Sequence, residues 1–390
     1  MPHSRSRHLE ELFFKRLKSN AVVALNGARQ VGKSFLAREI LKKHIRNSHY
    51  VTLDNPANLE MASTNPSSFL RQHPPSDLLI IDEAQKVPML FGAIKEIVDL
   101  NRTPQQFLLL GSTEFSHRTK IKESLTGRAT YLRLFPFNLA ETKHLPLSKS
   151  LFNQTLRVTR TETLKYLERG GMPGIFAVRD FETRQGFLND WIQLTLERDL
   201  LVIQGKSQIS PIFARRILQH IATQRDTSDS EIAKATRISI KTAQRYLSLL
   251  EALFVVSQIP VCLESTGRAQ YVLCDCGIAH ALGAPLLNKL RTWSHLELTS
   301  NLSNRSELLS SQLETYRGPK GGRIDFIFKG STGQRTAILI LPEEKFIQQD
   351  LEILKSFVSR FPDVRAVALA PVLKTIKLDK IEILPWETLC

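Results

Sequence analysis

The chain has 390 residues, enough for two to four domains, and its 42% hydrophobic and 23% charged residues exclude wholesale disorder. Lys and Arg number 53 against 38 Asp and Glu, and the resulting net charge of +15 favours polyanionic partners. Charges interrupt the apolar positions of the N-terminal segment, and no stretch has the apolar length that a bilayer span needs, so we expect a cytoplasmic protein without a membrane partner. The cysteines show neither a disulfide framework nor zinc-site spacing; they are Cys262, Cys274, Cys276 and Cys390.

A glycine-rich stretch lies between a predicted strand at 21–25 and a predicted helix at 35–41. This stretch, GARQVGKS, matches the phosphate-binding P-loop template G-x-x-x-x-G-K-[ST]. We expect its N–H groups and the helix N-terminus to point at the phosphates, Lys33 to reach the β- and γ-phosphates, and Ser34 to hold Mg²⁺. The predicted nucleotide-binding residues of the loop are Gly27, Ala28, Arg29, Gln30, Val31, Gly32, Lys33 and Ser34.

Two acidic residues end the next apolar run, LLIIDE at 78–83. The apolar residues predict a buried parallel strand, and acids at its carboxyl end lie where open α/β sheets bind ligands. We expect Asp82 to hold Mg²⁺ and Glu83 to be the base that orients the attacking water. A strand that merely ends in solvated acids is the alternative, which the P-loop upstream disfavours.

A third apolar run, FLLL at 107–110, ends in Gly-Ser-Thr, where Ser112 is a candidate sensor of the γ-phosphate; SLTGR follows at 124–128. In this order and spacing, GARQVGKS, LLIIDEAQ, FLLLGST and SLTGR resemble one group of bacterial and archaeal AAA+ ATPases, in which the ATPase core precedes a domain of unassigned function. The resemblance covers nearly the whole chain and is more specific in its first half. It implies ATP and Mg²⁺ as cofactors, and it makes Arg128 the candidate arginine finger, acting from the same chain or from a neighbour.

The region after this core predicts helices. GGMPG at 170–174 marks a tight turn, and the stretch that follows it resembles the helical connector of the same group. Ser228 with Glu231 predicts a capping box before one helix, and Ser239 is the predicted cap of a second helix that runs to about residue 253.

Two β-rich runs across a glycine turn at 264–268 predict a hairpin after these helices. Two helices and a hairpin in this order predict a winged helix-turn-helix. We expect it to bind duplex DNA through Lys241, Arg245 and Arg268. A solvated basic face, or a module that binds a protein partner, is the alternative.

The C-terminal region resembles, through the same group, a restriction-endonuclease fold that carries an Asp on one strand and Glu-x-Lys on the next. Asp325 matches the first acid, but Leu339 and Leu341 stand where the acid and the lysine belong. Glu343 and Lys345 form a shifted Glu-x-Lys, which Pro342 separates from the strand. The sequence therefore predicts a nuclease-like domain without nuclease chemistry.

The predicted fold class is α/β, with a P-loop NTPase (AAA+) parallel-sheet core at 1–147, a helical lid or linker at 148–209, a winged helix at 210–283 and a degenerate endonuclease-like α/β domain at 284–390. We expect Mg²⁺-dependent ATP hydrolysis coupled to conformational change on or with DNA. A slow ATP-dependent switch that binds a protein partner is the alternative, and a nuclease is the third reading. The sequence leaves homo-oligomerisation open.

Overall fold

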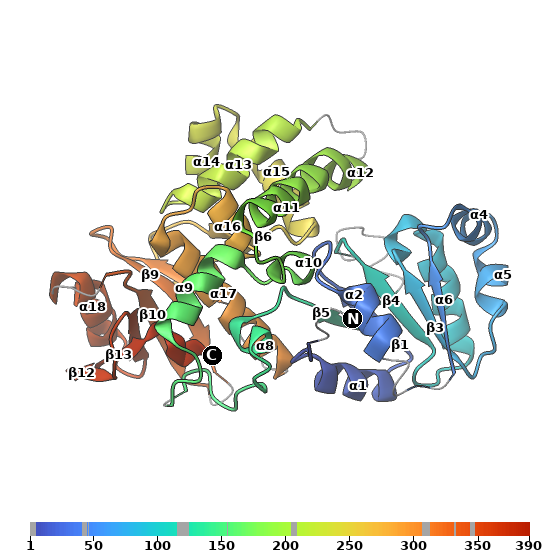
Figure 1. The fold of residues 1–390 in the computed structure, drawn as a ribbon, viewed down its shortest axis with the longest axis horizontal. Helices are drawn as coiled ribbons and strands as arrows, with labels where there is room; N and C mark the ends of the chain where they lie inside the picture. The colour runs from blue at the N-terminus through green and yellow to red at the C-terminus, as the bar shows by residue number, and fades with distance from the viewer. Residues whose placement is uncertain are drawn as a thin grey trace. The chain divides into compact units, whose positions relative to one another are not determined.

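The computed structural model describes residues 5–40, 45, 47–114, 125–153, 155–203, 209–305, 313–330, 333–343 and 348–390. The chain forms two compact units, both drawn in Figure 1. Unit 2 comprises Leu9–Phe135 and Ala252–Phe254, and unit 1 comprises Met1–His8, Pro136–Glu251 and Val255–Cys390. Each unit is therefore assembled from segments that are not consecutive in sequence.

Unit 2 contains a five-stranded sheet in the order β2-β3-β4-β1-β5, and all of its neighbouring strands are parallel. The strands are β1 (Val22–Asn26), β2 (Ser48–Thr52), β3 (Leu78–Asp82), β4 (Phe107–Gly111) and β5 (Ala129–Arg133). Strands β1, β3 and β4 are buried at every position, which is why they read as uninterrupted apolar runs. The predicted α/β class with a parallel-sheet core is confirmed.

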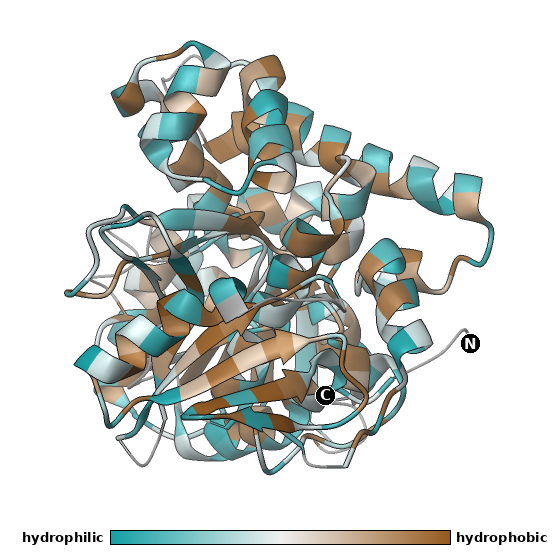
Figure 2. Ribbon diagram, turned by 90° about the vertical axis from the view of Figure 1, so that its left-hand side faces the viewer, coloured by the Kyte–Doolittle hydropathy of each residue, from teal (hydrophilic) through white to brown (hydrophobic). Residues whose placement is uncertain are grey.

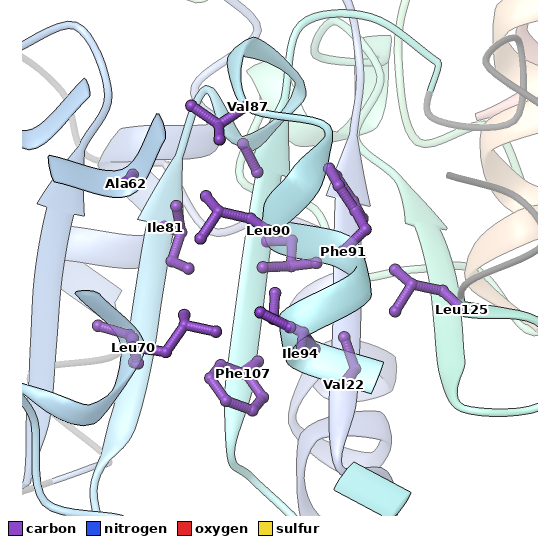
Figure 3. Close-up of a cluster of buried hydrophobic side chains, with 14 of the residues drawn as sticks. Val22, Ala62, Leu70, Ile81, Val87, Leu90, Phe91, Ile94, Phe107 and Leu125 are labelled. Carbon is purple, nitrogen blue, oxygen red and sulfur yellow. The ribbon is translucent and has the colours of Figure 1, made fainter. Parts of the chain in front are cut away.

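One helix precedes these strands and short helices connect them. They are α1 (Glu10–Ser19), α2 (Lys33–Phe35), the π-helix η1 (Leu36–Ile40), α4 (Pro56–Thr64), α5 (Pro66–Arg71), the 3₁₀-helix η2 (Ala84–Lys86) and α6 (Met89–Leu100). Figure 3 shows Leu90, Phe91 and Ile94 of α6 lying against Ile81 and Phe107 of the sheet. Burying an apolar side chain of this size contributes about 1.5–3 kcal/mol, so this core fixes the strands whose carboxyl ends carry the candidate site.

Unit 1 contains a six-stranded mixed sheet in the order β12-β13-β11-β10-β9-β8. Its strands are β8 (Glu314–Arg317), β9 (Arg323–Lys329), β10 (Arg335–Ile340), β11 (Arg365–Ala370), β12 (Ile376–Leu378) and β13 (Ile381–Pro385). In Figure 2 the strands beside the C-terminus are mostly brown, whereas the helices carry teal and brown residues together. The buried strands thus supply the apolar surface on which the amphipathic α18 (Glu352–Arg360) packs.

The remaining elements of unit 1 are mainly helical. They are α8 (Leu139–Thr142), α9 (Arg160–Arg169), α10 (Pro173–Phe176), α11 (Phe181–Leu194), the π-helix η4 (Thr195–Asp199), α12 (Leu200–Ile203), α16 (Cys276–Ala281), α17 (Leu286–Asn304) and the 3₁₀-helices η5 (Gln348–Leu351) and η6 (Trp386–Leu389). The predicted glycine turn at 170–174 packs closely, because a Cβ on Gly171 would lie 1.9 Å from the Phe137 carbonyl oxygen. Among the described residues, no helix combines the length and the apolar character that a membrane span requires.

Three helices and a two-stranded antiparallel sheet occupy the region predicted as a winged helix, which stays a prediction. They are α13 (Pro211–Thr223), α14 (Asp229–Thr236), α15 (Ile240–Ala252), β6 (Val256–Ile259) and β7 (Gln270–Leu273). Ser239 caps α15 as expected, since its Oγ accepts the Thr242 N–H at 3.1 Å. The predicted capping box of α14 is wrong, because the Ser228 hydroxyl lies 3.2 Å from the Ser230 hydroxyl instead of accepting from the described helix backbone.

The connection between β6 and β7 is joined to the C-terminal sheet. Val261 forms a parallel bridge with Thr315, the Cys262 N–H donates to the Thr315 carbonyl at 3.0 Å, and the Arg317 N–H donates to Ser265 Oγ at 2.9 Å. The segments 210–283 and 284–390, predicted as separate domains, therefore share backbone hydrogen bonds inside unit 1. The predicted domain boundaries remain predictions.

Residues 252–254, which begin with the last residue of α15, belong to unit 2. The Glu114 N–H donates to the Ala252 carbonyl at 2.8 Å, and the Arg133 guanidinium lies 4.8 Å from the Phe254 ring centroid. Phe254 has φ 59°, a left-handed conformation in which glycine is the usual residue at a helix C-terminus. A side chain other than glycine there is strained by about 1–3 kcal/mol, which the burial of the phenyl ring offsets.

Candidate nucleotide site

The P-loop between β1 and α2 is built on two glycines. A Cβ on Gly27 would lie 2.3 Å from the Leu134 carbonyl oxygen, and Gly32 has φ 97°, which side chains disfavour. Lys33 is only 6% exposed, and its Nζ donates to the carbonyl oxygens of Gly27 and Ala28 at 2.8 and 2.9 Å. The ammonium group of Lys33 thus lies inside the loop, in the position from which it would contact a bound phosphate.

The sheet order brings Ser34 and Asp82 together from positions far apart in sequence. Ser34 Oγ donates to Asp82 Oδ2 at 2.6 Å, and the Glu83 N–H donates to Asp82 Oδ1 at 2.9 Å. The hydroxyl of Tyr50 on β2 donates to Asp82 Oδ2 as well. Asp82 is 5% exposed, so these donors hold a buried carboxylate in one orientation.

Glu83 follows β3 with φ 56°, again in the left-handed region, which is uncommon for a residue other than glycine. Its Oε2 accepts from the Ser112 hydroxyl at 3.0 Å and from the Gln85 amide, while that amide also lies 3.2 Å from Ser112 Oγ. The structure therefore places the two predicted residues Glu83 and Ser112 in one hydrogen-bonded group. Strained backbone of this kind concentrates at functional sites.

These groups fit a magnesium nucleotide. Mg²⁺ prefers hard oxygen ligands and is usually held by one or two carboxylates together with substrate phosphates. Ser34 and Asp82 provide such oxygens, and the part of the chain that the structure describes contains no group of three or more His, Cys, Asp or Glu side chains able to hold a metal by itself. Lys33 and the loop N–H groups supply the positive charge that phosphates require.

Tyr50, Arg38 and Gln85 belong to this site and were missed by the sequence reasoning. The Arg38 guanidinium lies 4.3 Å from the Tyr50 ring centroid. Burial of the Tyr50 ring, followed by the Asp82 carboxylate, raises the Tyr50 pKa well above its ordinary value, so the phenol keeps its proton at neutral pH. Tyr50 and Arg38 occupy no motif, and only the placement of β2 beside β3 makes them neighbours of Asp82.

Arg128, the candidate finger, is not part of this group. Its guanidinium pairs with Asp99 near the end of α6, with Nε–Oδ1 at 2.5 Å and Nη2–Oδ2 at 2.8 Å. Ser124 of the same motif lies outside the described residues.

The predicted DNA-binding residues Lys241, Arg245 and Arg268 are all exposed in unit 1. Lys241 and Arg245 lie on the side of α15 opposite its buried apolar residues, which include Ala243, Tyr246 and Leu247. Arg7, in contrast, is buried against Glu141 and Phe137, so it belongs to the core of unit 1.

Asp325 lies in the interior of unit 1. It is 3% exposed, the Arg291 Nε lies 3.0 Å from its Oδ1, and its Oδ2 accepts the Ile340 N–H at 2.9 Å. Leu339 and Leu341 are buried in the core beside α18. Glu343 is exposed, and Lys345 lies outside the described residues. Asp325 is therefore buried and paired with neighbours in unit 1, and the nuclease-like domain without nuclease chemistry stays a prediction.

Comparison with family models places the candidate site in a known type of domain. Residues 19–143 match the model described as an AAA domain, which spans the P-loop, Asp82, Glu83 and Ser112. The part of the chain that carries the candidate site is therefore similar to AAA domains. Residues 160–292, which follow the AAA domain, match a domain of unknown function (DUF8612).

Curated relatives match the chain over part of their length. The chain is 29% identical over 270 residues to the uncharacterized proteins Rv2008c of Mycobacterium tuberculosis and Mb2031c of Mycobacterium bovis, which covers 67% of this chain and 56% of each relative. The uncharacterized protein MJ1544 of Methanocaldococcus jannaschii is 22% identical over 260 residues. The chain thus spans little more than half the length of the relatives that it matches.

Two solved structures show similarity at low identity. The Walker-type ATPase PABY2304 of Pyrococcus abyssi aligns with a TM-score of 0.40 and 16% identity, over 70% of this chain and 93% of that one. The RuvB Holliday junction branch migration motor of Thermotoga maritima aligns with a TM-score of 0.29 and 18% identity, over 64% and 90% of the two chains.

Proposed function

We propose that the AAA domain hydrolyses ATP with Mg²⁺. The observation that carries this proposal is the convergence of Lys33, Ser34, Asp82 and Glu83 at the carboxyl edge of one parallel sheet, with Ser34 Oγ 2.6 Å from Asp82 and Glu83 held by Ser112 at 3.0 Å. This edge is where open α/β sheets bind ligands.

Each residue has a separate task in this proposal. The P-loop N–H groups and Lys33 bind the phosphates, and Ser34 and Asp82 hold the metal. When bound, Mg²⁺ would neutralise charge on the phosphate oxygens. Ser112 and Gln85 orient the Glu83 carboxylate, which positions a water molecule and accepts its proton.

Two substitutions test the ATPase proposal. Glu83→Gln should bind ATP but hydrolyse it about 10²-fold more slowly or worse, because the water loses its base. Lys33→Ala should lose productive ATP binding, because the γ-phosphate loses its main cation. Binding of a fluorescent ATP analogue and phosphate release separate the two effects.

The matched controls for this test are Glu96→Gln and Lys95→Ala, which change exposed residues of the same types on α6. Both controls should behave as wild type. An unchanged rate of phosphate release in Glu83→Gln would disprove the assignment of Glu83 as the base.

We propose further that ATP turnover is coupled to duplex DNA. The net charge of +15 and the exposed Lys241 and Arg245 on α15 support this coupling. Phosphate contacts release counterions, so affinity should fall steeply with salt, by a slope of about 0.9 per neutralised phosphate. Lys241→Ala with Arg245→Ala should therefore weaken binding and flatten that slope by about one or two units.

A control pair separates local contacts from overall charge. Lys374→Ala with Lys380→Ala removes the same charge at exposed positions beside β12 and should leave the salt slope unchanged. If duplex DNA neither binds at low salt nor raises ATP turnover, the alternative of a slow switch that binds a protein partner is favoured. Metal-dependent cleavage of DNA that Asp325→Ala abolishes would instead support the nuclease reading.

A further inference from the structure

Tyr50 lies on β2, the edge strand beside β3. In the parallel register Tyr50 pairs with Ile80 and Thr52 with Asp82, so Tyr50 and Asp82 share one face of the sheet. The Tyr50 side chain extends along this face toward the carboxyl edge, where its hydroxyl donates to Asp82 Oδ2. This is the same oxygen that accepts from Ser34 at 2.6 Å.

The ring of Tyr50 is held from a second direction. Arg38, on the π-helix η1 directly after the P-loop helix α2, lies over the ring at 4.3 Å from its centroid. Such a cation–π contact contributes about 0.5–1 kcal/mol at an exposed site and more where it is desolvated. Tyr50 therefore links the segment that follows the P-loop to the carboxylate at the end of β3.

We propose that Tyr50 is a positioning residue that sets the affinity of the nucleotide site for Mg²⁺, by fixing the orientation of the Asp82 carboxylate. This inference rests on the proposed ATPase function, because that function makes Asp82 a metal-holding group. Partners that orient a metal ligand typically change metal affinity or activity by about 10–100-fold when they are removed.

A tyrosine on the opposite edge strand offers a comparison. Tyr131 lies on β5, is 43% exposed, and its hydroxyl makes no hydrogen bond within the described part of the chain. Packing on an edge strand alone therefore does not require a bonded hydroxyl. The Tyr50 hydroxyl donates to Asp82, so we expect its removal to change the orientation of the Asp82 carboxylate.

Tyr50→Phe tests the inference, because it removes only the hydroxyl and keeps the ring under Arg38. Binding of a non-hydrolysable ATP analogue is measured across a Mg²⁺ titration and again in EDTA, with Tyr131→Phe as the control. We expect the Mg²⁺ concentration at half-saturation to rise about 10–100-fold in Tyr50→Phe, with binding in EDTA unchanged. The ratio of the two affinities comes from one sample, so a partly unfolded fraction cancels.

The outcomes separate the two proposals. An unchanged Mg²⁺ requirement in Tyr50→Phe, or an equal loss of binding with Mg²⁺ and in EDTA, overturns the role of Tyr50. Wild-type protein that binds the analogue with Mg²⁺ but releases no phosphate from ATP contradicts the ATPase proposal alone. Wild-type protein whose binding ignores Mg²⁺ contradicts both.

Discussion

Arg128 immediately precedes β5, and β5 runs parallel to β1 with Ala129 beside Val22. Its backbone therefore lies at the amino edge of the sheet, whereas the P-loop follows the carboxyl end of β1. The five residues of β1 separate the two edges by about 16 Å, at about 3.3 Å per residue. This geometry does not fit a finger that acts on the nucleotide of its own chain, and it directs the prediction toward the nucleotide of a neighbouring copy.

If Arg128 acts between copies, Arg128→Ala should bind ATP normally and lose turnover by about 10³-fold or more. Mixing it with Lys33→Ala should then restore activity, since each variant supplies what the other lacks. Phosphate release from the separate and mixed variants measures this, together with the mass of the protein in solution with ATP.

Asp99→Asn is the control for Arg128, because it breaks the same ion pair and leaves the guanidinium in place. A purely structural pair predicts the same loss of turnover in both variants. A finger predicts the loss in Arg128→Ala alone, and the absence of any restored activity in the mixture would count against a role between copies.

The convergence of Ser34, Asp82, Glu83 and Ser112 could be anticipated from sequence, because each residue follows an apolar run that forms a strand, and parallel strands end at one edge. Tyr50 could not, because its strand β2 is half-buried and carries no motif. The position of the Gln85 side chain likewise depends on the left-handed backbone of Glu83, which the local sequence does not predict.

Helix α17 is buried along nearly its whole length although its sequence is polar, LLNKLRTWSHLELTSNLSN. Two of its polar side chains have partners within unit 1: Asn288 donates to the carbonyls of Ala222 and Gln224, and the Arg291 guanidinium lies beside Asp325. A sequence pattern without an apolar stripe does not predict a central helix. The helix is buried by segments that are far away in the chain, and the spacing of residues within the helix does not predict such contacts.

Glu297 of α17 is fully buried, and its Oε1 accepts the Leu139 N–H at 2.7 Å and the Trp293 Nε1–H at 2.9 Å. Burial, which outweighs these hydrogen bonds, raises the Glu297 pKa to about 8. The folded state thus keeps a proton that the unfolded state loses near its ordinary pKa of about 4.3. The contribution of this proton to stability is complete below that value and is lost as pH rises toward 8.

Glu297→Gln should therefore remove a decline in stability between about pH 5 and pH 8. The measurement is urea unfolding of wild type and variant at several pH values, and the quantity compared is the difference between the two unfolding free energies. As pH rises, the unfolding free energy of the variant should increase relative to that of wild type. Any loss of stability that the substitution causes at every pH does not affect this trend. A difference that does not change with pH would show that Glu297 titrates normally.

The division into two units could not be predicted from composition or motifs. The sequence places the end of the first domain at residue 147, whereas unit 2 ends at Phe135 and also takes in Ala252–Phe254. A few residues before α1 belong to unit 1, where Arg7 lies 3.3 Å from Glu141 and over the Phe137 ring. Long-range contacts of single side chains decide such assignments, and they leave no periodic signal in the sequence.

Arg7→Ala should destabilise unit 1 by about 3 kcal/mol, because it leaves the buried Glu141 without its ion-pair partner. Hydrogen exchange should become faster in α8 and α17 and stay unchanged in the sheet of unit 2. Lys15→Ala, at an exposed position of α1 in unit 2, is the control and should change stability by less than about 0.5 kcal/mol. Equal acceleration in both units would show that they unfold together.

The three residues Ala252–Phe254 have a consequence for biosynthesis. A chain leaves the ribosome at about 5–20 residues per second, and its domains generally fold as they emerge. The five strands of unit 2 are available once Arg133 has emerged, and so is the Phe135 ring beside the Arg133 guanidinium. The backbone partner of Glu114 and the second ring beside Arg133 arrive only with Ala252 and Phe254. Unit 2 therefore gains these contacts only after the end of α15 has been synthesised, and a fragment that stops at Phe135 would contain the five-stranded sheet without them.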